Sequence, residues 1–62
     1  MTSKKAMTEL RRFQRKSGWS QGQIAKAMGL HLQTVGGWFR EKYQPSILAV
    51  RVIEDFLKRR TK

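Results

Sequence analysis

The sequence predicts an all-α fold, a compact bundle of four short helices that forms a single domain over residues 1–62. Apolar residues recur at spacings of three and four along most of the chain, which is the period of an amphipathic helix. No segment alternates apolar and polar residues as a half-buried strand does. Gly18 and Gly29 stand where helical patterns stop, and glycine adopts the left-handed conformation that ends many helices at little cost.

The first helix is expected over residues 6–17, preceded by a short basic arm, residues 1–5. One face of this helix is apolar, while arginines and lysines lie around the rest. The apolar residues are Ala6, Met7, Leu10 and Phe13. Phe13, Trp19 and Trp38 have the helical spacing of core residues, which argues against a platform that stacks the bases of single strands.

The second helix is expected over residues 21–28. Ser20 stands at its N-cap, and Gln23 three residues later completes an S-x-x-Q capping box. A third helix follows over residues 32–40, with His31 at its N-cap, where histidine is a weak cap. Its inward face is formed by Val35, Trp38 and Phe39.

A fourth helix extends to about residue 59, and residues 58–62 form a basic tail. Two residues could be its N-cap. Either Gln44 caps the helix with Pro45 at the first helical position, or Ser46 caps it. Its inward face is formed by Ala49, Val50, Ile53, Phe56 and Leu57.

The charge balance points to a polyanionic partner. Fourteen Lys and Arg residues face four acidic residues, which gives a formal net charge of +10. A charge of roughly 2–8 is enough to keep a small domain soluble. The larger excess favours binding to nucleic acid or to an anionic membrane.

Other classes are disfavoured by what the composition lacks. The chain has no cysteine, which excludes disulfides and Cys-based zinc sites and favours the cytoplasm. The longest apolar run, residues 47–50, cannot span a membrane, and no apolar signal core follows the first residues. His31 is the only histidine, and no nucleophile–base pair or phosphate-cradling glycine loop is evident. We therefore expect no metal, no cofactor, no small-molecule ligand and no enzymatic activity.

Residues 20–40 read as a helix, a sharp glycine turn and a second helix, the layout of a helix-turn-helix. The S-Q-x-x-I-A-x-x-M-G opening and the V-G-x-W-F close resemble the lambda-repressor-like superfamily of phage and bacterial regulators, which includes many Cro proteins. The resemblance covers about residues 8–58, because Pro45-Ser46 and the apolar residues that follow are similar to the family's fourth helix. It implies that the third helix enters the major groove of double-stranded DNA. Many relatives add a fifth helix that builds the dimer interface, and this chain ends too soon for one.

The resemblance also implies which side chains contact DNA. Base-reading positions fall at Leu32, Gln33 and Gly37, while Thr34 is expected to touch a base or a phosphate. Gln33 can pair bidentately with adenine, and Leu32 is expected either to contact a thymine methyl group or to fold back onto the core. Phosphate contacts are implied for Gln21, Lys26, Arg40 and Lys42. At Gln21 the positive end of the second helix's dipole would strengthen the contact.

Two glycines in the middle of the third helix each cost roughly 1 kcal/mol relative to alanine. One interpretation is close backbone approach, to the second helix at Gly36 and to DNA at Gly37. The other is a locally loose helix that becomes firm on binding. The two interpretations are compatible.

The fourth helix carries more apolar residues than a four-helix core needs. The surplus residues are Ile47, Leu48 and Val52. We expect them to form the contact of a weak or DNA-assisted homodimer, the alternative being that they pack against the first helix.

These expectations combine into a sequence-specific, double-stranded DNA-binding transcriptional regulator of the bacterial cytoplasm or nucleoid. It would be a small phage, prophage or plasmid repressor of the Cro type that binds a near-palindromic operator as a dimer. Two alternatives are an architectural DNA-binding module of a recombination or packaging machine, and a cationic membrane binder. The glycine turn and the capping box disfavour the membrane binder, because a helix that lies on a membrane needs neither.

Overall fold

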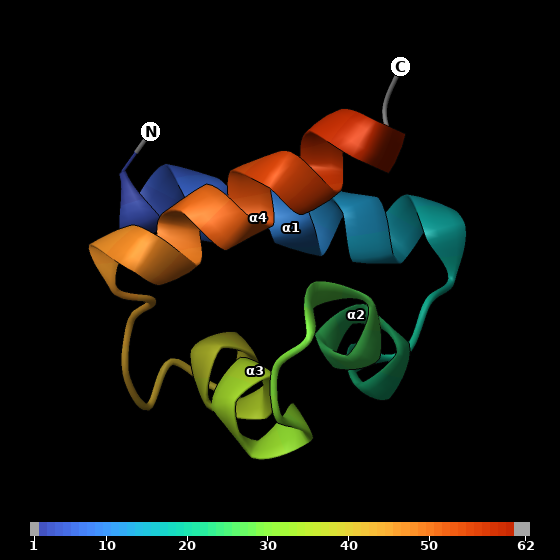
Figure 1. Ribbon diagram of the computed structural model, residues 1–62. Coiled ribbons are helices and arrows are strands. Elements are labelled where there is room, and N and C mark those ends of the chain that lie inside the picture. Colours follow the sequence, from blue (N-terminus) through green and yellow to red (C-terminus); the bar gives the residue numbers. More distant parts are fainter. Residues whose placement is uncertain (1, 61–62) are drawn as a thin grey trace.

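The computed structural model describes residues 2–60, which fold into four helices (Figure 1). The helices are α1 (Ser3–Ser17), α2 (Gln21–Met28), α3 (Leu32–Phe39) and α4 (Ile47–Arg60). The long helices α1 and α4 lie side by side in one layer, and the short helices α2 and α3 pack together beneath it (Figure 1). Residues 2–60 contain no strand, and the predicted all-α fold of four helices is confirmed. None of these helices is long and apolar enough to cross a membrane.

Helix α1 begins at Ser3, before the predicted start at Ala6. Thr2 is its N-cap, because the Thr2 hydroxyl accepts a hydrogen bond from the backbone N–H of Lys5 at 3.1 Å. The prediction of a basic arm is therefore wrong for residues 3–5. A threonine cap and straight-chain lysines, which lose little rotamer freedom in a helix, extend α1 backwards. Met1 lies outside the described residues.

Helix α4 continues to Arg60, so residues 58–60 of the predicted basic tail are helical as well. The guanidinium carbon of Arg60 lies 4.9 Å from the ring centroid of Trp19 and 5.0 Å from that of Phe56. Cation–π attraction to both rings and the negative end of the helix dipole hold this side chain against the domain. Thr61 and Lys62, the rest of the tail, lie outside the described residues.

The turn between α2 and α3 has the features that the sequence predicts. The Ser20 hydroxyl accepts from the backbone N–H of Gln23 at 3.1 Å, and the Gln23 side chain accepts from the backbone N–H of Ser20 at 2.8 Å. Gly29 has a left-handed backbone with φ of 72°. His31 precedes α3 and makes no side-chain capping bond, as expected for a weak cap.

Helix α4 is capped by Ser46, which decides between the two starts left open by the sequence. The Ser46 hydroxyl accepts from the backbone N–H of Ala49 at 3.2 Å. The Gln44 side chain instead accepts from the hydroxyl of Ser3 at 2.9 Å. Pro45, between Gln44 and Ser46 in the chain, is buried. These contacts tie the α3–α4 loop, residues 40–46, to the start of α1.

The core joins all four helices. Each helix contributes one large side chain that is completely enclosed, and these are Leu10, Ile24, Val35 and Ile53. Trp38 is only 4% exposed. Phe13, Trp19 and Phe56 form an edge-to-face trio with ring centroids between 5.0 and 5.9 Å apart. Phe13, Trp19 and Trp38 are therefore packing residues, as predicted.

Candidate nucleic-acid interface

The first turn of α3 is the part of that helix that faces solvent. Leu32 is 55% exposed and Gln33 is exposed beside it, whereas residues 35–38 are buried. Leu32 therefore projects outward and does not fold back onto the core. The two side chains form an outward-facing pair at the N-terminal end of α3.

Thr34 occupies a different position from this pair. It is half-buried and lines an apolar hollow of about 410 Å³ between α3 and α4, which we call the α3–α4 hollow. The lining residues include Leu30, Thr34, Trp38, Tyr43, Leu48 and Val52. Successive helical residues are about 100° apart, so the side that carries Thr34 is turned from Gln33 toward α4. Thr34 therefore lies next to the exposed Leu32–Gln33 pair but does not belong to it.

Gln21 and Arg40, both expected to contact phosphate, come together over Gly36. Gln21 is the first residue of α2, and Arg40 is the C-cap of α3. A Cβ at Gly36 would lie 3.4 Å from Oε1 of Gln21 and 3.7 and 3.8 Å from the terminal nitrogens of Arg40. These are ordinary van der Waals distances, so α2 and α3 approach each other at Gly36 but leave room for a Cβ there. An amide and a guanidinium beside the positive end of α2 are suited to an anion such as phosphate.

The C-terminal end of α3 is held by Arg11 of α1, a contact that the sequence did not predict. Nη2 of Arg11 donates to the backbone carbonyls of Trp38 at 3.5 Å and Phe39 at 3.2 Å. The last carbonyls of a helix lack partners within it, and an arginine side chain can satisfy them. In the sequence Arg11 is one of several basic residues around the first helix. Only the packing of α1 against α3 distinguishes it.

The expectation that Gly37 brings backbone close to DNA is corrected by the position of Tyr43. A Cβ at Gly37 would lie 2.7 Å from Cε2 of Tyr43 and closer still to Cζ and the hydroxyl. The Tyr43 hydroxyl donates to the backbone carbonyl of Gln33 at 3.0 Å. An aromatic ring from the following loop therefore fills the space in front of Gly37. The one signal in the sequence was a mid-helix glycine followed by a tyrosine in a polar loop.

The two lysines expected at phosphates lie in different places. Lys42 is exposed in the α3–α4 loop, two residues after Arg40. Lys26 is exposed on α2, about 140° around the helix from Gln21, so the structure does not bring these two together. Residues 10–40 contain no acidic residue, so phosphate would meet no carboxylate on α2 or α3.

The three apolar residues expected in a dimer contact do not share one surface. Ile47 is 83% exposed and Leu48 is 73% exposed, while Val52 is half-buried. Leu48 and Val52 line the α3–α4 hollow, whereas Ile47 lines a separate hollow with Thr2 and Pro45. The structure thus brings Leu48 and Val52 together and separates Ile47 from them.

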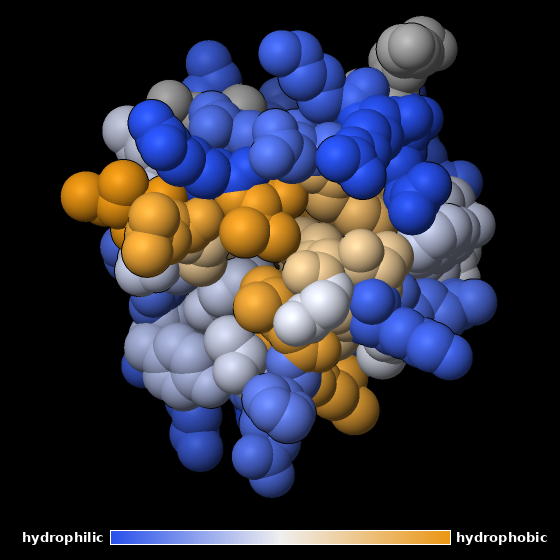
Figure 2. Space-filling model, viewed as in Figure 1, coloured by the Kyte–Doolittle hydropathy of each residue, from blue (hydrophilic) through white to orange (hydrophobic). Residues whose placement is uncertain are grey.

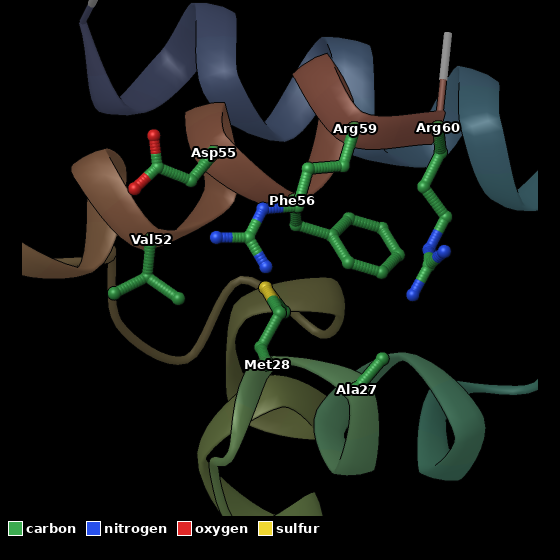
Figure 3. Close-up of a pocket in the computed structure, with 7 residues that line it drawn as sticks. All are labelled: Ala27, Met28, Val52, Asp55, Phe56, Arg59 and Arg60. Atoms are coloured by element: carbon green, nitrogen blue, oxygen red, sulfur yellow. The ribbon is translucent and has the colours of Figure 1, made fainter.

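Val52 also borders a second hollow, of about 220 Å³, between α2 and α4 (Figure 3). Val52 and Met28 point into it from opposite helices, and Phe56 forms part of its wall (Figure 3). Figure 2 shows apolar side chains gathered in a band between α4 and the α2–α3 pair. Val52 therefore connects the two hollows within one apolar surface.

A family model described as helix-turn-helix matches residues 9–61, which is most of the chain. The matched span includes α2, α3, α4 and most of α1, and so contains the glycine turn, the exposed turn of α3 and the Gln21–Arg40 pair. Comparisons with curated proteins and with solved structures gave no match. The matching family is a DNA-binding one and is typically non-enzymatic. The chain therefore belongs to the lambda-repressor-like and Cro-like helix-turn-helix family of DNA-binding proteins.

Proposed function

We propose that the protein is a sequence-specific, double-stranded DNA-binding transcriptional regulator, a small phage, prophage or plasmid repressor of the Cro type. The observation that carries the proposal is the exposed Leu32–Gln33 turn of α3, which belongs to the same short unit as the Gln21–Arg40 pair. Base edges are read by side chains in the major groove, while phosphate contacts fix the register of the protein. Repression would follow from occupying a promoter and excluding polymerase, in the bacterial cytoplasm or nucleoid.

The side chains divide between these two tasks. Gln33 pairs through its amide with an adenine edge, and Leu32 contacts a thymine methyl group. The phosphates of each half-site are held by Gln21, Arg40 and Lys42. Lys26 and Thr34 make further contacts at the edge of this interface. Because only two exposed side chains of α3 read bases, much of the affinity comes from phosphate contacts.

Two copies would bind a near-palindromic operator as a weak or DNA-assisted dimer. The apolar side chains of Leu48 and Val52 support this, because the hollow that they line adjoins α3. Fully burying one aliphatic side chain contributes roughly 1.5–3 kcal/mol, and association costs roughly 4–15 kcal/mol. Two such residues from each protomer are enough for only a modest dimer.

Selection of bound duplexes from a random pool tests the proposal. The protein should enrich a near-palindromic consensus with half-sites about 34 Å apart. A promoter that carries this consensus should be silenced in a reporter fusion when the protein is expressed. Enrichment without silencing would favour the architectural alternative, and the absence of any consensus would contradict sequence-specific binding. Binding to anionic vesicles as tight as binding to duplex at equal salt would favour the membrane alternative.

The dimer is tested by placing a charge on each side of α4. Leu48→Asp and Val52→Asp put an unpaired carboxylate in the α3–α4 hollow and should abolish cooperative binding to a duplex with two half-sites. Binding to a single half-site should change little. Ile47→Asp is the matched control, since Ile47 is even more exposed than Leu48 but lines a different hollow. Folded variants that all retain cooperativity would put the dimer contact elsewhere.

A further inference from the structure

Position 37 of α3 carries no side chain, and Tyr43 stands in its place. Gly37 is four residues after Gln33, so the two positions lie on the same face of α3, one turn apart. The Tyr43 ring occupies the space that a Cβ at Gly37 would enter. The ring therefore continues, along the helix, the surface that Gln33 begins.

The ring is fixed in this position from two sides. Its hydroxyl donates to the Gln33 carbonyl at 3.0 Å. Behind it the loop is anchored, because the backbone N–H of Lys42 donates to the Gly37 carbonyl at 2.9 Å and the Gln44 side chain bonds Ser3. Tyr43 is nevertheless 48% exposed. A side chain that is held in advance and half exposed loses little conformational entropy when it binds.

The chemistry of the exposed part of Tyr43 is apolar. The hydroxyl proton is donated to the Gln33 carbonyl, so the ring carbons are the part of Tyr43 left to make a new contact. In the major groove the apolar group is the C5-methyl of thymine, which apolar and aromatic side chains contact. We propose that Tyr43 is a specificity-determining residue, which contacts a thymine methyl at the base pair that residue 37 would otherwise read. This inference rests on the proposed function, because it requires α3 to lie in the major groove.

Replacing each thymine of the selected consensus by uracil tests the contact, since uracil lacks only the methyl group. The wild-type protein should lose about fourfold in affinity at the Tyr43 position, the value for burying one methyl-sized group. Tyr43→Ala should bind thymine and uracil equally at that position and still discriminate at the Leu32 position. Tyr43→Phe, which keeps the ring, should retain the wild-type profile.

Gly37→Ser tests the same contact from the helix, with Tyr43 itself kept in the sequence. Its Cβ displaces the ring and offers no apolar group in return, so thymine and uracil should again bind equally at that position. This variant keeps the test decisive if circular dichroism shows that Tyr43→Ala does not fold. A folded Tyr43→Ala protein that weakens all duplexes alike and keeps the wild-type uracil profile would overturn the proposal. A wild-type protein that enriches no consensus would overturn the proposed function, and this inference with it.

Discussion

The two connections that flank α3 end the preceding helices in the same way but with different residues. After α2, Gly29 takes the left-handed conformation, and the N–H of Leu30 donates back into α2 at 2.9 Å. After α3, Glu41 takes that conformation with φ of 61°, and the N–H of Lys42 donates back into α3 at 2.9 Å. Both are Schellman-type endings. The first uses the residue that adopts this backbone freely, and the second uses a residue that does so at a cost of roughly 1–2 kcal/mol.

The difference in backbone strain corresponds to a difference in the side chains of the two connections. In the α2–α3 turn the backbone N–H groups of Gly29 and Leu30 cap α2, and the His31 side chain makes no capping bond. The α3–α4 loop carries the side chains of Arg40, Lys42 and Tyr43, all of which belong to the candidate interface. Strained backbone is often found in segments that bind ligands, because the surrounding structure holds side chains in a required position. An unstrained turn precedes α3, and a strained loop that carries the candidate binding side chains follows it.

The largest expected effect is that of salt concentration on affinity for DNA. The salt dependence should also distinguish Arg40, in the loop after α3, from Gln21, at the start of α2. If a dimer neutralises on the order of 6–8 phosphates, the log–log slope of affinity against salt is about −5 to −7, or about 10³- to 10⁴-fold between about 50 and 200 mM. Arg40→Ala, in the loop, should flatten the slope by about 2, one phosphate for each protomer. Gln21→Ala should weaken binding without changing the slope, since its amide is neutral. Anisotropy titrations at several salt concentrations measure this, and equal slopes for Arg40→Ala and the wild type would contradict it.

The next largest effect is the difference between losing a base contact and losing a phosphate contact. Gln33→Ala should cost roughly 1–3 kcal/mol at one base pair of each half-site and should hardly change non-specific binding. Arg40→Ala should weaken all sequences alike. The measurement is binding of each variant to the consensus, to single-base variants of it and to unrelated duplex. If both variants change the sequence preference in the same way, the division between base and phosphate contacts is wrong.

The α2–α3 turn should be the connection that does not tolerate a side chain. Gly29→Ala places a Cβ on a left-handed residue and should lower the free energy of unfolding by roughly 1–2 kcal/mol. For a domain of this size that is a fall in Tm of at least about 4–8 °C. Gly22→Ala is the control, because Gly22 is helical and a Cβ there meets only Ser20 Oγ at 3.8 Å. Thermal melts followed by circular dichroism should show a lower Tm for Gly29→Ala alone.

The smallest expected effect is a gain at the α3–α4 loop. Glu41→Gly removes the left-handed strain and should raise the free energy of unfolding by up to about 1 kcal/mol. It also removes the carboxylate beside Arg40, so affinity for duplex should rise slightly. Glu41→Gln removes the charge but keeps the strain, and it should raise affinity without raising Tm. A fall in Tm for Glu41→Gly would show that the loop is not strained at this residue.

What the sequence predicts well is set by interactions between residues close in the chain. Ser20 and Gln23 are three residues apart, and each caps the other with no help from the rest of the fold. Gly29 ends α2 through its own backbone freedom. The buried faces follow from helical periodicity, and Val35 and Ile53 are enclosed as that periodicity requires. The α2–α3 turn and the core are therefore readable from the chain.

The α3–α4 side of the interface depends on contacts that no local pattern encodes. Arg11 reaches the end of α3 only because α1 packs against it. The fit of Tyr43 on Gly37 depends on the path of the loop, which a left-handed Glu41 directs. Glutamate is not a residue that signals this backbone in a sequence. The start of α1 differs from the prediction for another reason, because Lys4 and Lys5 suggest a basic arm in the sequence whereas Thr2 caps a helix that contains them.

The steric relation between Gly37 and Tyr43 also sets an order in which mutations can accumulate. While the ring lies on Gly37, any other residue at position 37 collides with it. Once position 43 is small, position 37 is free to gain a side chain. A lineage that acquires a new side chain at 37 must therefore lose the ring or move it aside, and the new side chain then excludes the ring from its present position. The two positions therefore constrain each other, although a helix boundary separates them.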